Sequence, residues 1–205
     1  MPGQTLTTEA IVIDRRPPTD AFQALGLFSP EHGNLHALQR IPRKASSPNA
    51  VPDLFDEVSA MLESSNQGRT WFVKEARVTV RRAGIGRSYD ALRFASALVA
   101  VISRNHVHEE SRENVALMLR TALDAFAAAG RPDIVYLKSL YVFARDEGYP
   151  VKQEWAPSLG GRESASAARI LGRPLEGQDA APEEVERLRR SLEGYLGERT
   201  EIVIP

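Results

Sequence analysis

The hydrophobic periodicity of this 205-residue sequence changes once along the chain, near Ser88. Before Ser88, apolar residues alternate with polar ones over short segments rich in β-branched and aromatic residues, a pattern typical of half-buried strands. After Ser88, apolar residues recur three and four positions apart, as on one face of an α-helix. The change predicts an α+β fold in which a strand region precedes a helical region.

The region before the change is expected to form a barrel. Residues 9–14 centre on the β-branched run Ile11-Val12-Ile13, and Pro17 and Pro18 then break the strand. Further strands are expected at residues 22–28, 34–41, 53–63 and 69–82. Residues 53–63 suit a helix or a strand, and we favour the strand; residues 43–52 are expected to be an exposed loop. Five short strands within about eighty residues predict a small closed barrel of the OB type.

The remaining chain is expected to be helical. Two helices are predicted to begin after the capping residues Ser88 and Ser111. Further helices are predicted at residues 133–144 and 163–171, and a last helix is predicted to begin at Pro182. A terminal strand is predicted at residues 200–204. The predicted domains are therefore an OB-fold domain at residues 1–84 and an all-α helical domain at residues 85–205.

Composition excludes several classes of function. The sequence has no cysteine, so disulfides, thiolate nucleophiles and cysteine-ligated zinc are excluded. No stretch approaches the roughly 18 apolar residues of a membrane span, and residues 1–8 lack the layout of a secretory signal. We expect a cytoplasmic protein with no membrane partner.

Charge is unevenly distributed along a chain whose net charge is only -1. Residues 69–87 contain six basic side chains against the single acid Glu75, whereas from Ala91 onward 15 basic residues face 17 acidic ones. A polyanion is therefore expected to bind the first region and not the second.

Several phrases resemble the RecO family of bacterial recombination mediators. In the first half these phrases are TTEAIVIDRR, FSPEHGNLHALQRIPRK and FVKEARV. In the second half they are YDALRFASALVAVISRN, LYVFARDEGYPV and LRRSLEGYLGERT. The resemblance covers nearly the whole chain. The residues that occupy the positions of the family's turn and basic strand end are Ser29, His32, Gly33, Ala37, Arg40, Arg43 and Lys44.

The resemblance implies a binding function without catalysis, cofactor or metal. A protein similar to RecO is expected to bind single-stranded DNA with its OB barrel, to anneal complementary strands, and to work with RecR in loading recombinase onto DNA coated by single-strand binding protein. Its helical half is expected to dock the acidic, apolar tail of that single-strand binding protein. Many family members carry a four-cysteine zinc site after the Gly-Tyr-Pro phrase. Here residues 151–172 offer buried packing by Trp155, Leu159, Ile170 and Leu171 in its place.

The candidate nucleic-acid-binding residues are the basic side chains of the predicted barrel, because phosphate contacts need lysine or arginine along one groove. They are Arg15, Arg16, Arg40, Arg43, Lys44, Lys74, Arg77, Arg81 and Arg82. Trp71 and Phe72 are adjacent on a strand and point to opposite faces, so one belongs to the core and the other could stack on a base, with packing favoured for both.

Two alternatives stay open. One is an interaction module that keeps the RecO-like fold but has lost DNA binding. The other is a metal-dependent nuclease built on His106 and His108 with Glu109 and Glu110, although such a sequence is more often a solvated connector. Gly84 and Gly86 are not followed by the Gly-Lys-Ser/Thr of a phosphate-binding loop, so we interpret them as a hinge between domains.

Overall fold

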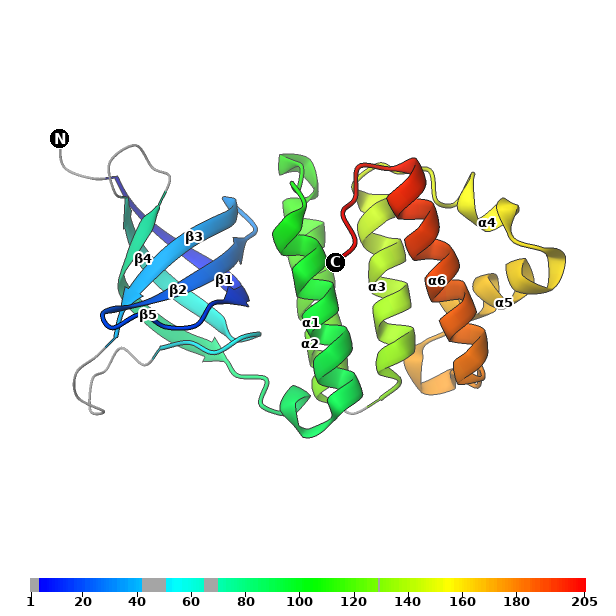
Figure 1. Ribbon diagram of the computed structural model, residues 1–205, viewed down its shortest axis with the longest axis horizontal. Coiled ribbons are helices and arrows are strands. Elements are labelled where there is room, and N and C mark those ends of the chain that lie inside the picture. Colours follow the sequence, from blue (N-terminus) through cyan, green and yellow to red (C-terminus); the bar gives the residue numbers. More distant parts are fainter. Residues whose placement is uncertain (1–3, 42–50, 65–69, 129) are drawn as a thin grey trace. The chain divides into compact units, whose positions relative to one another are not determined.

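The computed structural model describes residues 4–41, 51–64, 70–128 and 130–205 (Figure 1). The chain is α+β, with the strands first and the helices after them. It divides into two compact units, one comprising Met1–Arg82 with His106–Ala116 and the other Ala83–Asn105 with Leu117–Pro205.

Five strands form the first unit's sheet. They are β1 (Thr5–Arg15), β2 (Phe22–Ser29), β3 (Gly33–Arg40), β4 (Glu57–Ser64) and β5 (Trp71–Val80). Their order is β1-β2-β3-β5-β4, and β4 also pairs with β1, so the sheet closes into a barrel. All neighbouring strands are antiparallel except β3 and β5, whose parallel ladder consists of the pairs Ala37 with Trp71 and Leu38 with Phe72.

The barrel interior follows from the alternation in the sequence. Side chains that point inward form one apolar cluster, which consists of Ala10, Val12, Leu25, Leu27, Leu35, Ala37, Val58, Ala60 and Leu62. Alternate positions point outward, and polar residues dominate the outward positions of β3. The buried set Val58, Ala60 and Leu62 confirms the strand interpretation of residues 53–63.

A turn before β4 explains why this strand begins four residues later than predicted. Asp56 accepts a hydrogen bond from the Asp53 backbone N–H (2.8 Å), and Phe55 takes a positive φ of 73° with its ring buried. The Phe55 N–H donates to the Val12 carbonyl (2.9 Å), which fixes this turn against β1. An unusual left-handed conformation is thus held by hydrogen bonds on both sides.

The helices follow the sequence pattern closely. They are α1 (Tyr89–Arg104), α2 (Arg112–Ala127), α3 (Pro132–Asp146), α4 (Trp155–Ser158), α5 (Gly161–Gly172) and α6 (Pro182–Arg199), with 3₁₀ turns η2 (Ile85–Arg87), η3 (Glu109–Ser111) and η4 (Leu175–Gly177). Ser88 caps α1 as predicted, accepting a hydrogen bond from the Ala91 N–H (3.3 Å). In the second unit α3 packs against both α1 and α6 (Figure 1).

The segment after α3 is packed around an indole. Trp155, Leu159 and Ile170 are buried, as predicted, and Leu171 is half-buried. The Trp155 Nε1–H donates to Ser191 Oγ (3.1 Å), and the ring lies 6.0 Å from that of Tyr141. Apolar packing therefore holds this segment against α3 and α6.

The predicted strand at residues 200–204 is wrong, because these residues have no strand partner in the described chain. The Asn105 side chain instead bonds both backbone groups of Val203: Oδ1 accepts from its N–H (2.8 Å), and Nδ2 donates to its carbonyl (3.0 Å). Ile202 is buried beside this anchor. A side-chain amide thus satisfies the backbone that a strand ladder would otherwise satisfy.

Candidate nucleic-acid interface

The outward face of β2 and β3 carries both apolar and basic side chains. Cross-strand pairs on this face are Gly26 with His36, Ala24 with Leu38 and Phe22 with Arg40. Because Leu25 and Ala37 at the intervening positions belong to the core, the outward orientation of this row is fixed by the packing on the other face.

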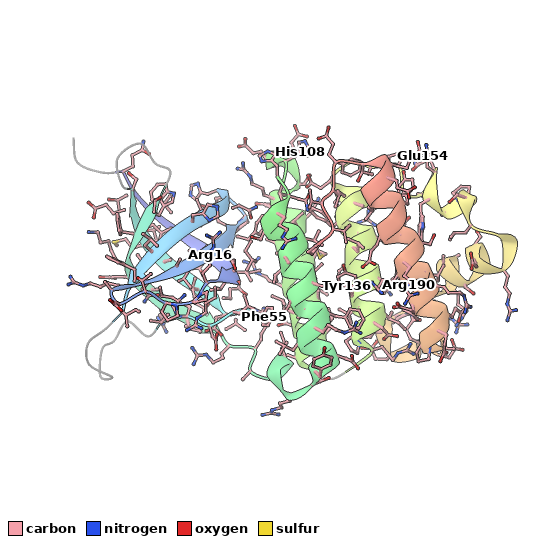
Figure 2. All side chains as sticks on the ribbon, viewed as in Figure 1. Arg16, Phe55, His108, Tyr136, Glu154 and Arg190 are labelled. Carbon is pink, nitrogen blue, oxygen red and sulfur yellow. The ribbon has the colours of Figure 1, made fainter. Side chains whose placement is uncertain are left out.

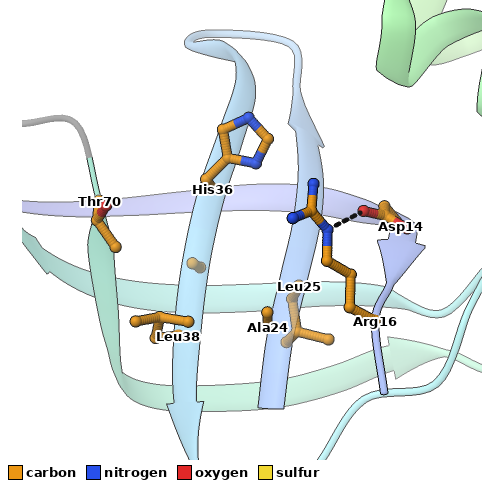
Figure 3. A pocket seen from close by; sticks show the side chains of 8 residues that line it. Asp14, Arg16, Ala24, Leu25, His36, Leu38 and Thr70 are labelled. Atoms are coloured by element: carbon orange, nitrogen blue, oxygen red, sulfur yellow. Dashed lines mark hydrogen bonds and ion pairs between the residues drawn. The ribbon is translucent and has the colours of Figure 1, made fainter. Parts of the chain in front are cut away.

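A hollow of about 340 Å³ lies over this face (Figure 3). Its lining residues come from the end of β1, from β2 and β3, and from the residue before β5; they are Asp14, Arg16, Ala24, Leu25, His36, Ala37, Leu38 and Thr70. The hollow is thus bounded by Arg16, the first residue after β1, and by Thr70, the residue directly before β5.

Gly26 shapes one wall of the hollow. A Cβ at this position would lie 2.7 Å from the Cβ of Asp14, so only glycine allows β1 to approach β2 this closely. Asp14 of β1 and His36 of β3 are the two cross-strand neighbours of Gly26.

Arg16 is the basic group of the hollow, and its backbone is held on both sides. Its N–H donates to the Ala24 carbonyl (3.2 Å), and its carbonyl accepts from the buried Gln23 amide. Its side chain is 68% exposed and pairs with Asp14 at 3.3 Å. It lies on the same side of the strands as His36 (Figure 3). A fixed backbone with an exposed charge suits contact with an anion.

The other predicted basic residues are dispersed. Arg40 is exposed at the outward position next to Leu38, while Arg77 is exposed on β5, where it faces Ser59 of β4 across the ladder. Within the described part of the chain, neither Arg40 nor Arg77 has a side-chain hydrogen bond or ion pair. Arg43 and Lys44 lie outside the described residues.

Three further candidates, like Arg16, are paired with acids. Arg15 lies 3.9 Å from Asp53, Lys74 pairs with Glu63, and Arg81 lies 3.0 Å from the buried Asp56 carboxylate. These pairs reduce the positive charge that each cation presents to a ligand.

Arg82 corrects the sequence interpretation, because it is 7% exposed and not on the barrel surface. Its guanidinium donates to the Phe55 carbonyl (3.2 Å) and to Glu57 Oε2 (3.3 Å). A buried arginine that bonds the backbone and a carboxylate supports the turn before β4 and does not reach a phosphate.

Sequence reasoning missed Phe22, His36 and Thr70 as parts of this face. Phe22 lies in an apolar run that predicts a strand but not which residues point outward. Its ring lies 6.1 Å from that of Phe72, and both residues are half-buried. Trp71, in contrast, packs against the barrel core, so of the adjacent pair Phe72 is the outward residue.

The alternative metal site gains no support from geometry. The rings of His106 and His108 are 5.8 Å apart and nearly perpendicular (Figure 2 labels His108). In the described ranges, no group of three or more histidine, cysteine, aspartate or glutamate side chains is arranged to hold a metal ion.

The second unit has a hollow of its own, of about 370 Å³, at the start of α3 and α6. Three arginines line it, and each already contacts an acid. Arg93 lies 3.4 Å from Asp90 and 4.2 Å above the Phe94 ring, Arg131 bonds Asp133, and Arg189 bonds Glu186.

The sequence matches no protein-family model and no curated protein. Among the described residues, no helix is both long and apolar enough to cross a bilayer.

Proposed function

We propose that this chain is a single-stranded DNA-binding protein of the RecO type whose ligand lies in the hollow over β2 and β3. One observation carries the proposal: the hollow is floored by β2 and β3 and bounded by Arg16, which follows β1, and by Thr70, which directly precedes β5. OB folds bind oligonucleotides on that combination of strands and loops. The strand order β1-β2-β3-β5-β4, closed on β1, also supports an OB assignment.

The charge on this face supports weak binding with a shallow dependence on salt. Arg16 and Arg40 are exposed beside apolar groups, while Asp14 offsets part of the charge. Because each phosphate contact releases a counterion, a site with few contacts depends less steeply on salt than a broad basic groove. Annealing of complementary strands is consistent with such a loose hold.

The test is to replace Arg16 and Arg40 together with glutamate. We expect the affinity for a single-stranded oligonucleotide to fall on the order of tenfold. The slope of log K against log salt, which is negative, should become less steep by about 1.4, or about 0.7 for each lost phosphate contact. Fluorescence anisotropy at several salt concentrations measures both quantities.

The matched control is the double variant Lys152→Glu, Arg162→Glu. Both residues are exposed in the second unit, and the change in net charge is the same. Equal losses of DNA affinity in the two double variants would mean that net charge alone sets the affinity. Unchanged affinity after reversal of Arg16 and Arg40 would mean that the DNA binds elsewhere.

Protein partners belong to the same proposal. A RecO-type mediator works with RecR and with the acidic, apolar tail of single-strand binding protein, and the helical unit is assigned to that tail. The slightly acidic balance of the chain from Ala91 onward supports a protein ligand over a polyanion there. If the wild-type protein does not bind single-stranded DNA, the chain is an interaction module that has lost DNA binding. No observation favours a nuclease.

A further inference from the structure

Two phenyl rings meet on the outward face of the barrel without being needed in its core. Phe22 comes from β2 and Phe72 from β5, and the two strands flank β3. Their centroids are 6.1 Å apart and their planes are inclined by 57°. Neither ring belongs to the barrel's apolar cluster, which Trp71 and Val73 of β5 complete from inside.

The inclination of the rings leaves aromatic surface available to a ligand. Parallel rings would cover one another's faces, whereas rings inclined by 57° do not. Both phenylalanines keep part of their surface in solvent. Exposed aromatic surface on a sheet bordered by cations is the arrangement with which proteins hold unpaired bases.

Positive charge lies directly beside the rings. Arg40 is the cross-strand neighbour of Phe22, and Leu38, the partner of Phe72 in the parallel ladder, lines the hollow that contains Arg16. A ligand that crosses this face therefore meets aromatic and cationic groups next to each other. A nucleotide, with a planar base and a charged phosphate, matches this pattern.

We propose that Phe22 and Phe72 form a stacking shelf for unpaired nucleobases at the edge of the hollow. This inference rests on the proposed function and deepens it, because it assigns the recognition of bases to two residues and the hold on phosphates to Arg16 and Arg40. Bases in a duplex are covered by their neighbours, so the shelf selects single strands over duplexes.

A purely structural role for the rings makes a different prediction. The β3–β5 ladder has only two residue pairs in its register, and the rings could serve to brace it. In that case, removing the rings lowers the melting temperature and leaves the affinity of the folded protein for DNA unchanged.

The deciding experiment compares two probes with the full-length protein. One is a labelled oligothymidylate, and the other is an oligomer of the same length in which every base is absent. We expect wild-type protein to bind the normal strand about 5- to 150-fold more tightly for each stacked base. The double variant Phe22→Leu, Phe72→Leu should lose most of this difference and keep its affinity for the abasic strand.

The control is the double variant Met61→Ala, Val80→Ala, which removes exposed apolar surface from other positions of the same barrel. It should preserve the difference between the probes. Circular dichroism at the titration temperature verifies folding. If the double variant does not fold, the single variants Phe22→Leu and Phe72→Leu are titrated with the same two probes, and a full preference for bases in both of them overturns the shelf.

The outcomes separate the two proposals. Binding of both probes with equal affinity by wild-type protein overturns the shelf and leaves the phosphate-binding function intact. An unchanged preference for bases in the folded leucine variant also overturns it. Binding of neither probe overturns the proposed function, and the shelf with it.

Discussion

Arg82 was predicted to contact DNA, but in the structure it is part of a buried ion pair. Its side chain is 3% exposed and that of its partner Glu57 is 12% exposed. Transfer of both charges out of water is costly. The attraction between the two charges and the hydrogen bond to the Phe55 carbonyl together offset that cost. Removing one partner is therefore far more damaging than removing both.

We predict that Arg82→Met lowers the free energy of unfolding by about 3–5 kcal/mol, because it leaves the Glu57 carboxylate buried without its guanidinium. Urea denaturation measures the loss. The double variant Arg82→Met, Glu57→Leu should recover much of it. Arg40→Met, at an exposed position, should change stability by no more than about 0.5 kcal/mol. A stable Arg82→Met protein would show that the pair is not a significant support of the turn.

At the scale of single residues, the sequence identifies chemistry better than location. The basic character of residues 69–82 is visible in the sequence, but whether an arginine at the end of a strand points inward depends on the strand's register and the following turn. The bulge in the β4–β5 ladder and the left-handed Phe55 set that turn, and neither leaves a periodic signal. The outward orientation of Phe22 was not predicted for the same reason, because it depends on the register of β2.

The elements themselves are largely predictable, because each strand and helix has its own period. The alternation of Val58, Ala60 and Leu62 suits a helix or a strand in the sequence alone. In the structure these residues form a strand because β1 and β5 pair with them on either side. The short helix α4 was not predicted, since four residues contain too little periodicity. Residues 200–204 have strand-forming side chains, but the Asn105 side chain hydrogen-bonds the N–H and the carbonyl of Val203 in place of a strand partner.

The segment around α4 depends on Trp155, whose ring is 1% exposed. We predict that Trp155→Ala destabilises the protein by about 3–5 kcal/mol through the lost transfer energy and the cavity left behind. Thermal melting monitored by circular dichroism tests this. Trp155→Phe should be milder, because it retains a ring but gives up the bond to Ser191. If the alanine variant melts like wild type, the indole does not hold this segment.

For the whole molecule, α6 contributes a dependence of stability on acid. The hydrogen bond from Ser166 and then the Arg169 guanidinium lower the pKa of Glu184, and the bonds from Arg189 and then Arg190 lower the pKa of Glu186. A carboxylate whose pKa is lower when folded stabilises the protein above its unfolded pKa, near 4.3, and loses that contribution as the pH falls through the folded value.

We therefore predict that the melting temperature falls as the pH is lowered from about 5 to about 3. Glu184→Gln should be less stable than wild type at pH 7, and the gap between the two should narrow in acid. Glu183→Gln, a neighbouring exposed position with the same charge change, serves as the control. A gap that stays constant across this range would mean that Glu184 does not contribute through ionisation.

Closure of the barrel also removes one route to self-association. An open sheet ends in two strands whose free N–H and C=O groups can recruit another chain, which is a common start of aggregation. Here β3 and β5 pair with each other, so the sheet has no terminal strand. A foreign strand must first displace the short β3–β5 ladder, and for this unit recruitment by strand addition carries that energetic barrier.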